Sequence, residues 1–224
     1  LFRLGPPQEP LHFVQGDGVY LRAPVSSDFT AWAQLRGQSR DFLVPWEPVW
    51  PADDLTRAAY RRRLKRQEEE LARDETYPFF VFRSQDHALL GGMTLGHIRR
   101  GVAQTGTLGY WAGQPFAGQG YMSNGVRALC RFAFATLGLH RIEAACLLHN
   151  VPSARLLRRC GFKYEGEARA YLRINGLWQD HQLFALLDND DIPPSGAPVH
   201  REEETSPAGC KPEASAVPIT IPTR

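Results

Sequence analysis

Residues 113–122 read Gly113-Gln114-Pro115-Phe116-Ala117-Gly118-Gln119-Gly120-Tyr121-Met122. The apolar run Thr107-Leu108-Gly109-Tyr110-Trp111 comes before this stretch and is typical of a β-strand. After it, apolar residues recur at helical spacing from Met122 to Leu137. A strand, a glycine-rich turn and a helix N-terminus form a geometry that binds phosphate, because backbone N–H groups converge there and the helix dipole adds positive potential. The same glycines also suit an ordinary tight turn, so this stretch alone leaves both interpretations open.

The composition is that of a single soluble globular domain. The chain has 224 residues, of which 43% are hydrophobic and 22% charged, and this length can bury a sizeable core. No run approaches eighteen apolar residues, so we expect no membrane-spanning helix and no membrane partner. The first residues, Leu1-Phe2-Arg3-Leu4, lack the apolar core of a signal peptide.

The cysteines favour a reducing, cytoplasmic setting. They lie far apart and form no CxxC pair, so we expect buried free thiols rather than disulfides or a zinc site, and no metal. The four positions are Cys130, Cys146, Cys160 and Cys210.

Charge and composition divide the chain into three segments. From Asp188 onward there are seven acidic and three basic residues, seven prolines and little apolar content, which predicts a disordered tail over 188–224. The preceding body therefore carries a net charge of +6, although the whole chain carries only +2. That charge suits an anionic ligand but is too low for a nucleic-acid binder, so we expect no direct nucleic-acid specificity. We predict an N-terminal extension over 1–18 and one domain over 19–187.

The first half of the domain is predicted as a strand at Val19–Arg22 followed by two helices. Asp28 is the expected N-cap of the first helix, and Asp53 or Asp54 that of the second, which runs to about Arg73. The second helix carries the run Arg61–Glu70. Its basic residues precede acidic ones by three to four positions, which favours a solvated helix face over a nucleic-acid patch.

Between these helices, the stretch Arg40–Pro51 contains three prolines and two tryptophans. The prolines argue against a helix or a central strand and predict a loop. Two interpretations are open for it: a packed surface loop, or the wall of a substrate site in which Trp46 offers surface and Glu47 offers charge.

The second half is predicted as a meander, a crossover and a hairpin. Strands at 77–82 and 88–98 lead to the strand before the glycine-rich turn, and the helix after that turn ends near Gly138. A strand at 141–146 follows, parallel to the one before the turn because a helix connects them. A short helix starting at 150–153 and a hairpin with the turn Asn175-Gly176 complete the domain.

This order of elements, together with several motifs, resembles the GNAT acyl-CoA N-acetyltransferases and, more narrowly, their RimJ/RimL branch, which acetylates protein N-termini including those of ribosomal proteins. The resemblance covers roughly Val19 to Leu187. It implies an α/β fold with a mixed, mostly antiparallel, splayed sheet flanked by helices, and acetyl-CoA as co-substrate. The motifs that carry it are Phe116-Ala117-Gly118-Gln119-Gly120-Tyr121, Gly109-Tyr110-Trp111, Leu139-His140-Arg141-Ile142-Glu143-Ala144, Asn150-Val151-Pro152-Ser153, Gly161–Gly166 and Tyr171–His181.

The resemblance also implies roles for individual residues. Asn150 would hydrogen-bond the pantetheine chain, and Ser153 would lie near the sulfur as the acid for the leaving thiolate. From the residue types alone, Asn150 and Ser153 are better explained as caps of the short helix, for which Asn and Ser are favoured. The backbone groups implied to bind the pantetheine arm are those of Tyr110, Trp111 and Ala112, and those implied to bind the pyrophosphate are the N–H groups of Ala117, Gly118, Gln119, Gly120, Tyr121 and Met122.

The sequence departs from the family pattern at two positions. Pro115 stands where the family tends to have Arg or Gln, and it removes one N–H donor. Leu172 stands where one member of the branch has a glutamate on the penultimate strand. The remaining candidates for a general base are Glu143, Glu165 and Glu47.

We therefore expect an acetyl-CoA-dependent N-acetyltransferase whose acceptor is a protein α-amine, such as the N-terminal alanine of a ribosomal protein. An α-amine has a pKa of about 7.7–8.0, so roughly a tenth or more is neutral at pH 7, whereas a lysine amine with a pKa of about 10.4 is neutral only about once in 2,500 molecules. Two alternatives stay open: acetylation of a small amine such as an antibiotic, and a non-catalytic CoA-binding or ribosome-assembly module. The expected oligomeric state is a monomer or weak dimer.

Overall fold

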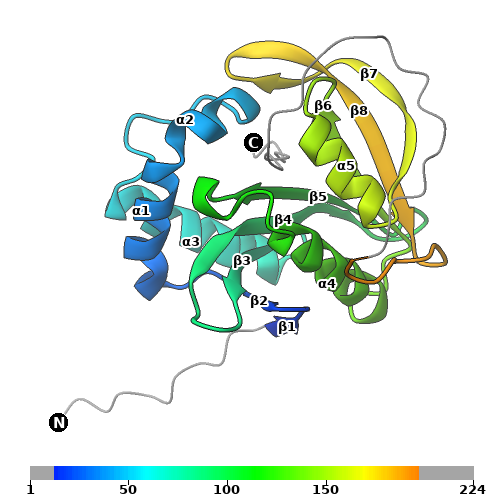
Figure 1. Ribbon diagram of the computed structural model, residues 1–224, viewed down its shortest axis with the longest axis horizontal. Coiled ribbons are helices and arrows are strands. Elements are labelled where there is room, and N and C mark those ends of the chain that lie inside the picture. The colour runs from blue at the N-terminus through cyan, green and yellow to red at the C-terminus, as the bar shows by residue number, and fades with distance from the viewer. Residues whose placement is uncertain (1–12, 197–224) are drawn as a thin grey trace.

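The computed structural model describes residues 13–196, which form one mixed sheet with helices on both faces (Figure 1). The strands are β1 (Phe13–Gln15), β2 (Val19–Arg22), β3 (Tyr77–Arg83), β4 (Leu89–Arg99), β5 (Thr105–Ala112), β6 (Arg141–Leu147), β7 (Lys163–Ile174) and β8 (Leu177–Leu187). Their order across the sheet is β1-β2-β3-β4-β5-β6-β8-β7. Among these strands only β5 and β6 pair in parallel, which confirms the predicted mixed, mostly antiparallel sheet.

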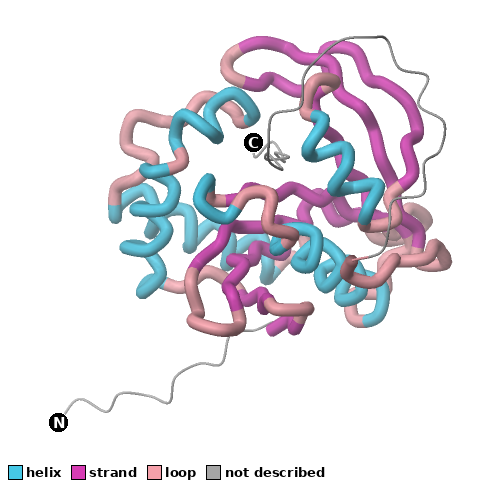
Figure 2. The backbone as a smooth tube through the Cα atoms, viewed as in Figure 1, coloured by secondary structure: helices cyan, strands magenta, loops and turns pink. Residues whose placement is uncertain are grey.

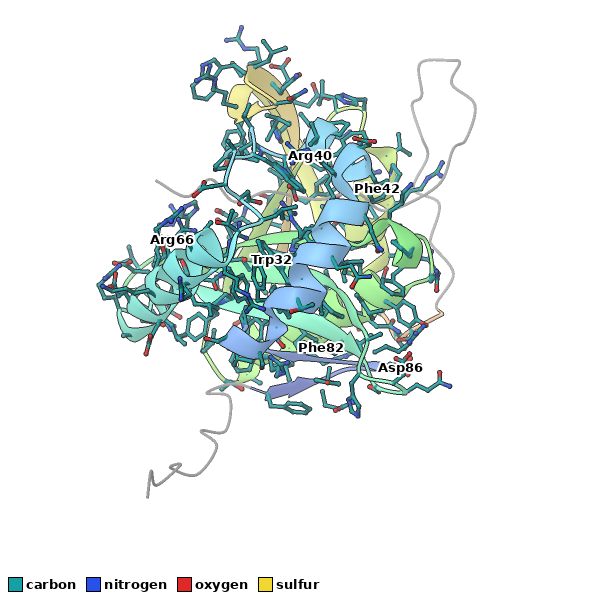
Figure 3. The ribbon with its side chains drawn as sticks, turned by 90° about the vertical axis from the view of Figure 1, so that its left-hand side faces the viewer. Trp32, Arg40, Phe42, Arg66, Phe82 and Asp86 are labelled. Carbon is teal, nitrogen blue, oxygen red and sulfur yellow. The ribbon has the colours of Figure 1, made fainter. Side chains whose placement is uncertain are left out.

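Five α-helices and three short 3-10 turns lie within the same residues. Figure 1 shows α4 and α5 on one face of the sheet, and Figure 3 looks at the opposite face, which α1 and α3 cover. The helices are α1 (Phe29–Gln38), α2 (Arg40–Leu43), α3 (Arg57–Ala72), α4 (Tyr121–Ala135) and α5 (Val151–Arg159), and the turns are η1 (Ser26–Asp28), η2 (Val44–Trp46) and η3 (Gln114–Phe116).

Alternation along the strands divides the core into two clusters. In β3, Phe79 and Val81 belong to the larger cluster, which packs under α4 and α5, whereas Phe80 and Phe82 belong to the smaller one. The smaller cluster packs under α1 and α3 around Trp32, which is fully buried. The sheet is therefore covered on both faces, which explains why β3 reads as a continuous apolar run.

The long β7–β8 hairpin curves away from the rest of the sheet (Figure 2). Its turn is the predicted Asn175-Gly176, with φ values of 45° and 81° that a type I′ turn requires.

Asp28 is the N-cap residue of α1, as predicted, although its side chain makes no hydrogen bond to that helix and instead accepts from Arg22 and from the Val25 N–H. Two predictions about local structure are wrong. Thr56, rather than Asp53 or Asp54, caps α3 by accepting the Ala59 N–H. The stretch Arg40–Pro51 is not a plain loop, because α2 and η2 occupy its first half.

The predicted end of the crossover helix is displaced as well. The structure ends α4 at Ala135, and Gly138 follows two residues after the C-cap with φ of 64°. The predicted solvated face of α3 is confirmed by ion pairs at its surface, including Lys65–Glu69 and Arg66–Glu70.

The described part of the chain extends past both predicted domain boundaries. β1 lies inside the predicted extension and pairs with β2. Beyond β8, Ile192 packs against the larger core cluster, and Ser195 Oγ donates a hydrogen bond to Asn124 Oδ1. Residues 1–12 and 197–224, which hold most of the predicted extension and tail, lie outside the described residues.

Cys130, Cys146 and Cys160 are buried free thiols, as predicted, while Cys210 lies outside the described residues. None of the helices in residues 13–196 has the length and apolar character that crossing a membrane requires.

Candidate functional site

The pairing between β5 and β6 ends after three residues. The pairs are Thr105–Arg141, Gly106–Ile142 and Thr107–Glu143. Beyond them β6 stays paired with β8 as far as Leu147, whereas β5 stays paired with β4 as far as Ala112. Within the described chain, the edge of β5 that faces β6 therefore has no strand beside it from residue 108 to 112. Such an edge presents N–H and C=O groups that can pair with an extended ligand.

The glycine-rich stretch connects this edge to a helix N-terminus. After β5 the chain makes the turn η3 and then enters α4 through Gly118 and Gly120, whose φ values are 75° and 84°. Gly120 is the N-cap of α4, and a Cβ added to it would meet no atom within 4 Å, so the glycine serves the left-handed backbone and not a tight contact. The first turn of α4 contains no acidic residue. The N–H groups of residues 118–122 thus lie where an anion is favoured, whereas that of Ala117 donates to the Gln114 carbonyl at 3.3 Å.

Two buried hydroxyl groups connect β5 to α5 across the divergence of the strands. Tyr110 Oη lies 2.8 Å from Ser153 Oγ, and Ser153 is fully buried. Burial raises the pKa of Tyr110 well above its usual value, so the phenol keeps its proton at neutral pH. Asn150 caps α5, because its Oδ1 accepts the Ser153 N–H at 3.1 Å. The capping interpretation is therefore correct for Asn150, while the Ser153 hydroxyl points to Tyr110.

Burial also raises the pKa values of the cysteine thiols in the described residues. It raises the pKa of both Cys146 and Cys160 to about 12, and that of Cys130 well above its usual value. In the described residues every thiol is therefore protonated at neutral pH and is a poor nucleophile. The same residues contain no cluster of His, Cys, Asp or Glu that could hold a metal ion.

A cleft of about 1330 Å³ lies on the face of the sheet that α1 and α3 cover. It lies between α3, the segment after η2 and strands β3 to β5, and we call it the large cleft. The buried guanidinium of Arg36 contacts several side chains in the wall of this cleft. The Arg36 guanidinium donates to both carboxylate oxygens of Glu47, at 2.7 and 2.8 Å, and lies over the rings of Trp50 and Trp111. Trp50 Nε1 donates a third hydrogen bond to the same carboxylate. The Glu47 carboxylate is thus occupied by hydrogen bonds from Arg36 and Trp50. The other predicted substrate contact, Trp46, lies near His149, with the two ring centroids 5.3 Å apart.

A backbone hydrogen bond joins the β7–β8 hairpin to the segment that lines the large cleft. The Asn175 N–H, at the tip of the β7–β8 hairpin, donates to the Glu47 carbonyl at 2.9 Å. In Figure 1 this tip lies next to the region of α2, far from the other strands of the sheet. The hairpin therefore forms an arch from the sheet to the segment that carries Glu47.

A smaller cavity of about 210 Å³ lies where β5 and β6 diverge; we call it the small cavity. Two of the predicted candidate bases line it, and both are in ion pairs: Glu143 with Arg99 and Arg141, and Glu165 with Arg141. Leu172 also lines it.

Three contributors to this region are not indicated by any motif in the sequence: Arg36, the Tyr110 hydroxyl, and His97, which lines both the large cleft and the small cavity. Arg36 lies eleven residues before Glu47 in an ordinary helical pattern, so no local motif indicates their contact.

Comparison with known proteins finds a matching family and several proteins of similar sequence. Residues 19–163 match the family model described as Acetyltransferase (GNAT) domain. A Bacillus subtilis protein named Probable N-acetyltransferase YjcK is 36% identical over 178 residues, which cover 80% of this chain and 98% of that protein. The ribosomal protein uS5-alanine N-acetyltransferase of Escherichia coli is 34% identical over 168 residues, which cover 74% of this chain and 87% of that protein.

A solved structure described as Mycobacterium smegmatis RimJ in complex with CoA-disulfide has a similar fold. Its TM-score is 0.74 at 27% sequence identity, and the match covers 80% of this chain and 87% of that one.

The Arg36–Glu47 pair gives a prediction about stability. Glu47→Gln should lower the free energy of unfolding by about 3 kcal/mol, because it leaves the buried Arg36 charge with only Asp54, at 4.0 Å, as a carboxylate partner. The matched control is Glu69→Gln, which breaks a surface pair with Lys65 and should cost less than about 1 kcal/mol. Chemical denaturation measures both, and equal losses in the two variants would contradict the role given to Glu47.

Proposed function

This chain belongs to the GNAT acetyltransferases, and on that basis we propose that it transfers the acetyl group of acetyl-CoA to the α-amino group of a protein N-terminus, with a ribosomal protein as first choice. The observation that carries this proposal is the divergence of β5 and β6, which lies between an anion site on one face of the sheet and the large cleft on the other. The two substrates would approach from opposite faces and meet between the strands. Such an acceptor would place the protein in the cytoplasm.

The residues around the divergence fit acetyl-CoA. Its pyrophosphate would accept hydrogen bonds from the N–H groups of residues 118–122, where the left-handed glycines open the turn. Its pantetheine arm would pair with the β5 edge at Tyr110, Trp111 and Ala112, which β6 leaves uncovered. Asn150 lies at the start of α5 on the other side of that gap.

The acceptor is inferred from the charges in the large cleft. Each acidic side chain that lines the cleft is in an ion pair with an arginine, so a small polycationic amine would have to displace arginines to bind. A neutral peptide segment has no such requirement. The arch between Asn175 and Glu47 also suits a thin, extended segment better than a folded surface. The pairs are Glu47–Arg36, Asp53–Arg62, Asp54–Arg63, Glu70–Arg66 and Glu75–Arg73.

In this proposal the α-amine attacks the thioester carbonyl directly. Backbone N–H groups on the uncovered part of β5, residues 108–112, would hold the oxyanion of the tetrahedral intermediate. The C–S bond then breaks, and the hydroxyl pair of Tyr110 and Ser153 would supply a proton to the departing thiolate. The protonated cysteines in the described residues favour direct attack over an acetyl-cysteine intermediate.

An acceptor screen tests the proposal. Peptides that begin with Ala or Ser should be acetylated by acetyl-CoA, whereas the same peptides with a blocked N-terminus and an internal lysine, and polyamines, should react at least tenfold more slowly. Mass spectrometry locates the acetyl group. Preferred acetylation of polyamines would favour the small-amine alternative, and absence of acetyl-CoA binding at micromolar concentration in isothermal titration would contradict the enzyme assignment.

Gly120→Ala should weaken acetyl-CoA binding. A left-handed alanine costs roughly 1–2 kcal/mol, which corresponds to about five- to thirtyfold in affinity if binding requires this backbone. Gly101→Ala is the matched control, because Gly101 also has a positive φ, of 64°, and open space around its Cα, but lies in the turn between β4 and β5. Isothermal titration should show weaker binding only for Gly120→Ala, and an equal change in both variants would contradict the anion site.

Ser153→Ala separates an enzyme from a non-catalytic CoA-binding module. Removing the hydroxyl should lower kcat by roughly ten- to a hundredfold and leave acetyl-CoA affinity within about threefold, because the serine acts on the leaving group. Ser84→Ala, at an exposed serine of the β3–β4 turn, should leave kcat unchanged. An unchanged kcat in Ser153→Ala would remove the hydroxyl from the mechanism.

A further inference from the structure

A β-bulge in β4 reorients His97. Gly96 pairs with Thr107 and Arg99 with Thr105, so the two residues His97 and Ile98 lie opposite the single residue between those partners. His97 has a φ of 50°, a left-handed conformation that a residue with a side chain rarely adopts. Bulges and backbone strain of this kind concentrate at functional sites, where they aim a side chain that the regular strand would direct elsewhere.

The packing around the bulge shows where the two side chains go. Strand alternation without the bulge would place His97 on the same face as Leu95, which lies in the core under α4. Ile98 occupies that position instead. A Cβ built on Gly106 would approach Ile98 Cδ1 to 2.9 Å and Leu95 Cδ1 to 3.0 Å, so these two apolar side chains lie side by side on one face. The exposed imidazole of His97 lies in the lining of the large cleft and of the small cavity.

This position lies at the start of the gap in which the two substrates of the proposed reaction would meet. The strand partner of Gly96 is Thr107, which with Glu143 makes the last pair before β5 and β6 diverge. His97 therefore stands beside the start of the gap, on the face from which the acceptor would arrive.

The other ionisable groups that line these cavities near His97 come from three elements. They are Glu75 before β3, Arg141 and Glu143 on β6, and Glu165 and Tyr171 on β7. Each of the three carboxylates is already in an ion pair with an arginine. Imidazole is the side chain whose ordinary pKa, about 6.5, suits proton transfer near neutral pH.

We propose that His97 is the general base that accepts a proton from the acceptor α-ammonium; this inference rests on the proposed function. The N–H bond of the ammonium breaks and its proton moves to an imidazole nitrogen, directly or through one water. The released amine lone pair forms the C–N bond at the thioester carbonyl, and the C–S bond then breaks. The thiolate gains a proton, the amide nitrogen loses its second one, and the imidazolium returns its proton to solvent.

The first test compares His97→Gln with His87→Gln by steady-state kinetics on an Ala-initiated peptide. His87 is a matched control, because it too is a histidine with a left-handed φ, of 56°, but lies in the β3–β4 turn. At pH 7, His97→Gln should lower kcat roughly a hundredfold with little change in acetyl-CoA affinity, whereas His87→Gln should leave kcat unchanged. The defect should shrink toward pH 9, as more of the amine is neutral in solution. A defect that is independent of pH would overturn the proposal.

Two further variants separate catalysis from folding. His97→Gly should raise the melting temperature, because glycine adopts the left-handed backbone without strain, and should still lose activity. Added imidazole should restore part of the activity of His97→Ala but none of that of Ser153→Ala. A fully active His97→Gly would overturn the role of His97. If instead the wild-type protein binds acetyl-CoA but acetylates no peptide, the proposed function fails and not the assignment of the base.

Discussion

The site depends on one limit to hydrogen bonding: parallel pairing between β5 and β6 ends after Thr107 and Glu143. Each strand is held on its other edge, β5 by β4 and β6 by β8, so neither can bend back to close the gap. An uncovered strand edge inside a domain is costly unless another group satisfies it. The divergence therefore leaves an uncovered strand edge at which the proposed ligand would pair.

The two faces of the sheet carry different parts of the candidate site. One carries the glycine turn and α4, whose N–H groups and dipole favour an anion. The other carries a cleft whose carboxylates are all neutralised by arginines, with Arg36 buried between two tryptophan rings and Glu47. A buried ion pair adds little net stability but is expensive to break. It therefore fixes the position of a proline-rich segment that has little regular structure of its own.

Features with local causes could be predicted from the sequence. The Asn175-Gly176 turn, the glycine turn before α4 and the parallel crossover all follow from residue types at short spacing. Features that depend on distant partners could not. The carboxylate of Asp28 is occupied by Arg22, and that of Glu47 by Arg36, so neither is available for the cap or the substrate contact that its position indicates. The bulge at His97 is a property of strand pairing, which a single strand does not reveal.

The arch between the hairpin and the segment that carries Glu47 joins two backbone groups, the N–H of Asn175 and the carbonyl of Glu47. Its geometry is consequently independent of most of the side chains on either segment. Exposed positions such as Val49, Leu177 and Trp178 border this contact and take no part in the core. Relatives with this architecture can therefore vary the chemistry of the cleft rim, and with it the choice of acceptor, while the cofactor half of the molecule and the fold stay the same.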